Sequence, residues 1–163
     1  MKGSDAGRPS AFETIVYGGL VVGVLDFLDA SIFFPLYYGI GFTDVWHSVA
    51  AGVMGHQAAG EGGWATAILG IFLHFVVAFC VATVYFLGTR VLPLIVNWWI
   101  ASGLAYGIVV HFVMQYVVIP LSLAARTTPS TFRLAAFLNS VIGHALLVGL
   151  PIAFIANRSA KRN

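Results

Sequence analysis

The chain has 163 residues, of which 60% are hydrophobic and only 9% are charged, and its formal net charge is +2. A soluble domain carries roughly a quarter charged residues, so this composition excludes an ordinary soluble domain and predicts a surface that faces lipid. The small charge argues against a nucleic-acid partner. The single cysteine, Cys80, excludes an intrachain disulfide and is expected to be buried in its apolar run.

Four apolar stretches are long enough to cross a hydrocarbon core, which takes about 20 residues of helix. Long continuous runs favour helices over the short alternating strands of a membrane barrel. The first stretch is too long for a signal peptide, so we expect it to be retained. Pro35 and Pro120 are expected to end the first and third helices, because proline lacks an N–H. The predicted spans are 12–34, 64–88, 94–119 and 132–156.

The segment 42–60, between the first two spans, is too polar and too rich in glycine to cross the bilayer. Val45, Val49 and Val53 recur every four residues, which predicts a short amphipathic helix on the membrane surface or folded back against the bundle. The predicted fold is therefore all-α, a four-transmembrane-helix bundle with a short amphipathic helix between helices 1 and 2. The polar side chains of the whole stretch 41–63 belong either to a plain surface helix or to a ligand-contacting or re-entrant segment: His47, His56, Gln57 and Glu61.

Lysine and arginine are unevenly distributed between the two ends of these spans. One side carries Lys2, Arg8, Arg90, Arg158, Lys161 and Arg162, whereas the other carries Arg126 and Arg133. Because basic residues concentrate on the cytoplasmic side, both termini are predicted to be cytoplasmic.

Two helices carry glycine pairs at four-residue spacing, Gly19 with Gly23 and Gly103 with Gly107. Such pairs let another helix approach closely, either inside the bundle or in a second subunit. The second and fourth spans each carry a histidine near mid-span. Together these features suggest one hairpin used twice in the same direction, as in some transporters.

Ionisable residues at mid-depth form the most informative pattern. Asp at a helix centre costs roughly 2.5 to 3.5 kcal/mol on insertion scales, so such residues usually face the bundle interior and have partners. Counted from the span ends at 1.5 Å per residue, they fall near one common level. The predicted intramembrane polar layer consists of Asp26, Asp29, His74, His111 and His144.

This layer has three possible meanings: a structural hydrogen-bonded network, a path for protons or a small solute, or a metal or haem site. No histidine spacing is specific for a metal, and no catalytic motif stands out, so neither a resident cofactor nor an enzyme is predicted.

A longer series of short motifs resembles a family. In chain order these are Gly23-Val-Leu-Asp26, Ala50-Ala51-Gly52-x-x-Gly55, Gly62-Gly63, Leu73-His74-Phe75 with Tyr85, Tyr106-Gly107, Met114, Pro120-Leu121-Ser122, Gly143-His144 and Gly149-Leu-Pro-Ile-Ala153. Over about residues 15–158 they look like a group of uncharacterised bacterial inner-membrane proteins similar to the YagU-like family. The resemblance implies a four-helix protein of the bacterial inner membrane and supplies no substrate, cofactor or catalytic residue.

The function that these observations favour is a non-enzymatic scaffold or accessory subunit. It would pack through its glycine-rich faces as a homo-oligomer or within a larger membrane complex. The alternative is a small transporter or proton-linked permease that uses the Asp/His layer. A haem-binding redox subunit is the third possibility.

Overall fold

The computed structural model describes residues 8–125 and 132–162. Within these residues the chain forms helices and no strands. Four helical stretches are long and apolar enough to cross a membrane, which confirms the predicted all-α, four-span fold: Glu13–Tyr38, Gly63–Val91, Trp99–Leu121 and Leu134–Ala160.

Three of these four stretches contain a π-helical turn, and short helices lie between them. In chain order the elements are η1 (Glu13–Tyr17), α1 (Gly18–Tyr38), α2 (Phe42–Met54), α3 (His56–Glu61), α4 (Gly63–Val91), α5 (Leu94–Asn97), α6 (Trp99–Val113), η2 (Met114–Val118), α7 (Ile119–Leu121), α8 (Leu134–Gly143), η3 (His144–Gly149) and α9 (Leu150–Ala160). The labels beginning with η mark the π-helical turns.

The prolines do not end the helices as predicted. Helix α1 continues through Pro35 to Tyr38, and it ends at Gly39, which adopts a left-handed conformation with φ 66°. The Gly39 N–H donates to the Pro35 carbonyl at 2.9 Å. Pro120 likewise lies inside α7. A proline near a helix end removes few main-chain hydrogen bonds, so the helix can continue past it for part of a turn.

Two predicted helices are interrupted. The expected span 94–119 breaks at Trp98, where φ is −100° and ψ is 42°, so α5 is separate from α6. Two side chains donate to the main chain of α5: Ser102 Oγ to the Ile95 carbonyl, and Asn157 Nδ2 to the Val96 carbonyl, both at 2.8 Å. The segment 42–60 breaks at Gly55, where φ is 80° and a side chain would be strained.

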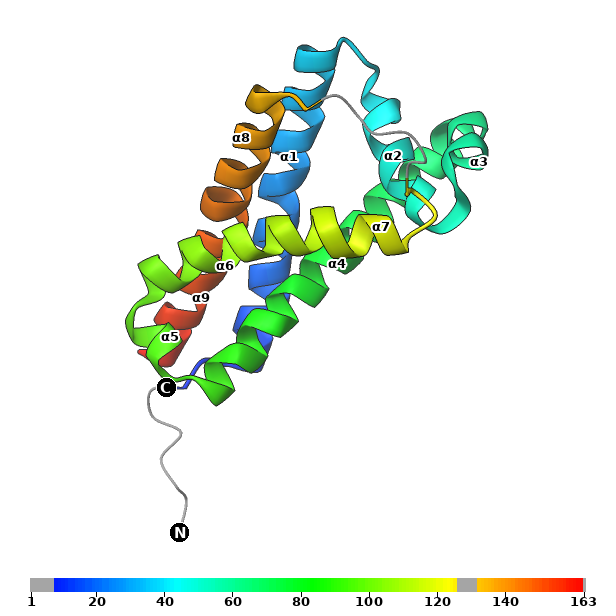
Figure 1. Cartoon of the computed structure of the whole chain (residues 1–163). Coiled ribbons are helices and arrows are strands. Elements are labelled where there is room, and N and C mark those ends of the chain that lie inside the picture. The colour runs from blue at the N-terminus through cyan, green and yellow to red at the C-terminus, as the bar shows by residue number, and fades with distance from the viewer. Residues whose placement is uncertain (1–7, 126–131, 163) are drawn as a thin grey trace.

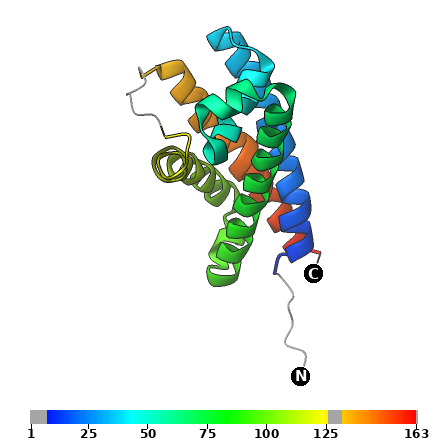
Figure 2. The same cartoon turned by 90° about the vertical axis from the view of Figure 1, so that its right-hand side faces the viewer.

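The helices are arranged as three lengthwise elements crossed by a fourth (Figure 1). Helices α1, α4 and α8–α9 run along the molecule, whereas α6–α7 runs across them; Figure 2 shows α7 nearly end-on. Helix α2 folds back and packs along α4. A side chain at Gly70 of α4 would overlap the main chain of Trp46, so the two helices approach closely there.

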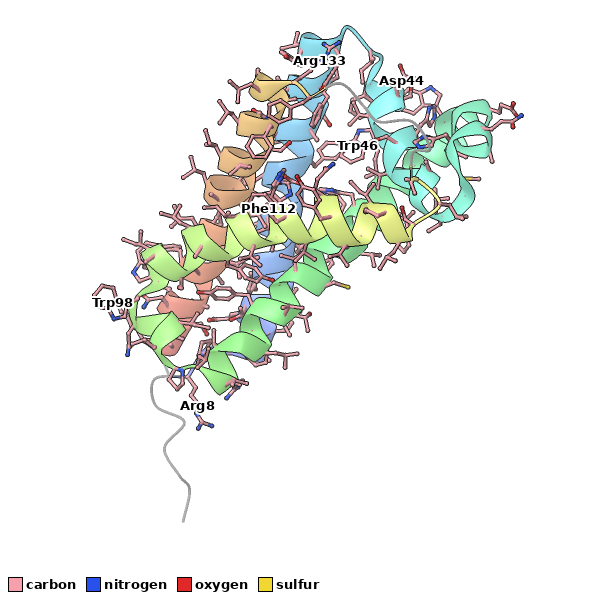
Figure 3. The ribbon with its side chains drawn as sticks, viewed as in Figure 1. Arg8, Asp44, Trp46, Trp98, Phe112 and Arg133 are labelled. Atoms are coloured by element: carbon pink, nitrogen blue, oxygen red, sulfur yellow. The ribbon has the colours of Figure 1, made fainter. Side chains whose placement is uncertain are left out.

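The two ends of the described chain meet at one end of the molecule, here called the terminal end. The Ser10 N–H donates to Ser159 Oγ at 2.7 Å, and Arg162 lies 3.2 Å from the Glu13 carboxylate. Arg90 also reaches this end, because its guanidinium donates to the Pro9 carbonyl. Arg133 and Asp44 lie at the opposite, distal end, and Arg8 lies at the terminal end (Figure 3). Lys2 and Arg126 lie outside the described residues.

The terminal half of the bundle is closely packed. Its core holds small and branched side chains from α1, α4, η3 and α9: Val22, Ala82, Tyr85, Val148, Ile152, Ala153 and Ala156. Cys80 is exposed on α4, so the prediction that it is buried is wrong. Helix α4 is apolar on all sides, and Cys80 lies on the side that faces outward.

Candidate functional site

A cavity of about 1070 Å³ occupies the distal half of the bundle. Helices α1, α2 and α4 and the α6–α7 and α8–η3 helices all contribute to its wall. Ligand sites in proteins are commonly clefts of roughly 300–1,000 Å³, so the cavity is large enough for a small organic molecule. The structure places the whole predicted polar layer on this wall: Asp26, Asp29, His74, His111 and His144.

Asp26 on α1 and His74 on α4 are neighbours on the cavity wall. His74 Nε2 lies 2.9 Å from the Gly23 carbonyl, which can only accept, so this nitrogen carries the hydrogen. The other ring nitrogen, Nδ1, lies 3.9 Å from Asp26 Oδ2. In a neutral imidazole Nδ1 is then an acceptor, so two acceptors face each other. One added proton, on either the ring or the carboxylate, removes that mismatch.

The pair is partly accessible, since the exposed fractions of the His74 and Asp26 side chains are 13% and 23%. A proton can therefore reach it from the cavity.

Asp29 lies one turn further along α1 and has a different partner. Its Oδ2 accepts from Asn139 Nδ2 of α8 at 3.0 Å. A Cβ added at Gly143 would lie 3.3 Å from the same oxygen, so the glycine leaves room for the carboxylate. The sequence marked Asn139 only as a possible extension of the network, because nothing in its spacing pointed to Asp29.

His111 and His144 form the third polar group. Their rings lie edge to face with centroids 5.4 Å apart. His144 Nδ1 donates to the Ser140 carbonyl at 2.8 Å, which leaves its Nε2 as an acceptor in the neutral ring. His111 is buried, and its Nε2 has no hydrogen-bond partner among the described residues. His144 also begins the π-helical turn η3, a local distortion that is frequent at functional sites.

Trp46 of α2 forms part of the cavity wall and is only 1% exposed. Its ring stacks on Phe27 at 4.7 Å and meets His74 edge-on at 5.3 Å. Trp46 lies inside the molecule because α2 folds inward onto α4. The indole nitrogen has no partner among the described residues. The buried face of α2 is Val45, Trp46, Ala50 and Ala51, whereas Val53 is exposed.

Two charged residues lie where the wall reaches the distal end. The Arg133 guanidinium lies 5.0 Å from the centroid of the Tyr38 ring, a cation–π contact. Asp44 accepts from the Gly41 N–H at 2.8 Å, at the start of α2. Both residues line the cavity, so they define its distal mouth.

The four polar candidates of the segment 42–60 do not join this wall. His47 Nε2 lies 2.8 Å from the Gly63 carbonyl, and His56 Nε2 lies 2.9 Å from the Ala124 carbonyl. Gln57 donates to Glu61 at 3.0 Å on the exposed face of α3. The two histidines therefore hold turns and neighbouring segments together.

Both glycine pairs are occupied within the chain. A Cβ atom added at Gly19 would lie 2.5 Å from the Phe79 ring, and one added at Gly23 would lie 2.6 Å from the Phe75 ring. Both rings belong to α4. Gly103 and Gly107 face the main chain of η3 and α9. Each pair thus packs against the next spanning helix in sequence, and each meets a histidine-bearing helix. The two glycine pairs thus have similar surroundings. This similarity is compatible with the predicted duplication, which stays a prediction.

Among residues 8–125 and 132–162, no group of three or more His, Cys, Asp or Glu side chains is arranged to hold a metal ion. Comparisons with protein-family models, with curated proteins and with solved structures find no match. The resemblance to the YagU-like family therefore stays a prediction.

Proposed function

We propose that this integral membrane protein is a small proton-linked permease whose solute site is the distal cavity. The observation that carries the proposal is the gathering of five ionisable side chains from all four spanning stretches on one cavity wall. Placing each of them at membrane depth is costly, and intramembrane ionisable residues often mark ion or substrate paths.

The cavity is closed toward the terminal end, as an alternating-access mechanism requires. Three of its lining residues also belong to the core of the terminal half or pack against it: Val22, Val81 and Val148. Beyond them Tyr106 donates to the Val81 carbonyl at 2.6 Å, and the Tyr85 and Ser102 hydroxyls lie 3.1 Å apart. These contacts join α4 to α6 and separate the cavity from the terminal end.

The Asp26–His74 pair is the proposed proton site. Its two facing acceptor atoms, His74 Nδ1 and Asp26 Oδ2, offer a place for one proton, and the charge of a bound solute would favour uptake or loss of that proton. If both termini are cytoplasmic in a bacterial inner membrane, as the basic residues favour, the cavity is open on the opposite side.

The scaffold hypothesis has less support from the geometry. Its main observation was the pair of glycine motifs, and those motifs contact helices of the same chain. A homo-oligomer or larger complex remains compatible with the proposal, because the remaining apolar helix faces are free to contact lipid or protein. No contact in the cavity specifically favours haem.

The permease is tested in liposomes loaded with a pH-sensitive dye. Gradients of a small organic cation, an anion and a neutral solute are imposed in turn, and the internal pH is followed. Wild-type protein should couple at least one solute to proton movement. Asp26→Asn and His74→Ala should reduce that movement to the level of empty liposomes.

Glu13→Gln is the matched control, since this carboxylate pairs with Arg162 at the terminal end and lies outside the cavity. It should retain coupled movement. Wild-type protein that moves no protons with any solute, or full coupling in a folded Asp26→Asn variant, contradicts the proposal.

A further inference from the structure

The charges on the cavity wall are unbalanced. Its described residues include three carboxylates, Asp26, Asp29 and Asp44, and one permanently charged base, Arg133. Arg133 lies at the mouth over Tyr38, so among the residues that the structure describes the deeper part carries two carboxylates and no lysine or arginine. A carboxylate in such a site is stabilised by an opposite charge, and a bound cation supplies it.

We infer that the distal cavity binds a small organic cation, a protonated amine, with its charge against Asp29. This inference rests on the proposed function, because it names the solute class of the same site. Asp29 suits the role better than Asp26, whose open side faces His74. Asp29 is oriented by Asn139 and has Gly143 beside it, so its carboxylate is held in place by a neutral hydrogen-bond donor.

The histidines do not supply a fixed positive charge. His74 and His144 each bond a main-chain carbonyl through one nitrogen, a contact that the neutral ring makes fully. Protonated rings are the competing source of positive charge, and in that case an anion or a neutral solute would bind as well as an amine. The affinity order of matched solutes therefore separates the two possibilities.

Two buried rings on the same wall carry a nitrogen that has no partner among the described residues. They are Trp46 and His111, which are 1% and 6% exposed. An unpaired buried polar group costs roughly 1–3 kcal/mol. Because both nitrogens are covered by protein atoms, a ligand can recover that cost only where its binding shifts the wall. Phe34, Tyr38 and Trp46 add aromatic surface that suits the carbon skeleton of an organic cation.

The experiment measures binding, so that its failure is distinguishable from failure of the permease. Phenethylamine, phenethyl alcohol and hydrocinnamate share one skeleton and differ in charge. Each is titrated by calorimetry into the protein in nanodiscs, with empty nanodiscs subtracted. The amine should bind at least tenfold more tightly than the alcohol, and hydrocinnamate should bind more weakly than either.

Asp29→Asn should weaken binding of the amine about tenfold or more and leave that of the alcohol unchanged, because the amide removes the charge but still accepts from Asn139. Glu13→Gln should change neither. Equal affinity for the amine and the alcohol, tighter binding of hydrocinnamate, or no effect of a folded Asp29→Asn variant would overturn the inference. Amine binding without coupled proton movement would remove the permease and leave the cation site. Coupled proton movement with no preference for the amine would remove the cation site and leave the permease.

Discussion

The two halves of this bundle use their glycines and alanines in different ways. In the terminal half, glycines and alanines bring helices into main-chain contact, and Gly103, Gly107 and Gly149 lie directly against one another's backbones. In the distal half, Gly143 instead leaves space that the Asp29 carboxylate occupies. Gly70 also brings α4 close to the main chain of Trp46 in the distal half, so that half differs in the space beside Gly143, which a polar group occupies. We expect stability to depend on the terminal half and solute binding on the distal half.

The largest effect is expected from Gly107→Ala. A Cβ there would overlap the main chain of His144, so α6 and η3 must separate. Overpacking of this kind typically costs 1–3 kcal/mol, and backbone contact favours the upper end, about 3 kcal/mol of unfolding free energy. Unfolding in mixed micelles measures it. Gly60→Ala is the control, since nothing lies within 4 Å of its added Cβ, and an equal loss there would remove the distinction between the halves.

Tyr106→Phe comes next. It deletes the hydroxyl that donates to the Val81 carbonyl and joins α6 to α4. We expect a loss of about 1–2 kcal/mol in the same unfolding assay, because a buried carbonyl loses its side-chain donor. The variant should also raise the solute-independent proton leak of liposomes. A loss of stability without added leak would mean that contacts other than Tyr106–Val81 close the cavity toward the terminal end.

Trp46→Phe should cost less than about 1 kcal/mol although the side chain is fully buried. The smaller ring loses contacts but can keep the stack on Phe27, and the substitution removes an indole N–H that has no described partner. Solute binding should change more than stability does. The free energy of unfolding and the calorimetric affinity are measured on one preparation. A loss of about 3 kcal/mol of unfolding free energy would show that α2 stabilises the bundle as much as the helices of the terminal half do.

Asp26→Asn should have the smallest effect on stability, within about 0.5 kcal/mol. The side chain is partly exposed to the cavity, and its 3.9 Å separation from His74 is too long for a hydrogen bond. Coupled proton movement should nevertheless disappear. Severe destabilisation of this variant would mean that the Asp26–His74 pair is a structural ion pair, and the two halves would then differ less than we conclude.

Hydropathy alone predicted the number and approximate limits of the spanning helices, because length and composition determine what can cross a bilayer. The cost of charge in lipid also marked Asp26, Asp29 and the three mid-span histidines. The breaks at Gly55 and Trp98 were not predictable in this way, since both residues also occur within regular helices. Trp98 in particular allows α6 to take a direction different from that of α5.

The cavity itself was beyond sequence reasoning. It exists because α6–α7 crosses the other helices, and α4 and α6 are apolar on all sides, so neither marks the face that turns inward. The roles of Trp46 and Asn139 depend in the same way on tertiary packing, of α2 on α4 and of α8 on α1. Their partners lie on helices distant in the sequence, and only the arrangement in space brings them together.

The segment after α7 is attached to the amphipathic helices at two points. The Leu123 N–H donates to the Gly52 carbonyl at 3.0 Å, and His56 bonds the Ala124 carbonyl. Hydrogen bonds thus join the end of the α6–α7 helix to both α2 and α3, and we expect these elements to move together. Widening or narrowing of the mouth then falls to the opposite side, where α8 meets α1 through Asn139 and Asp29. This contact includes the carboxylate that would hold the charge of the proposed solute, so we expect solute binding and the width of the mouth to depend on each other.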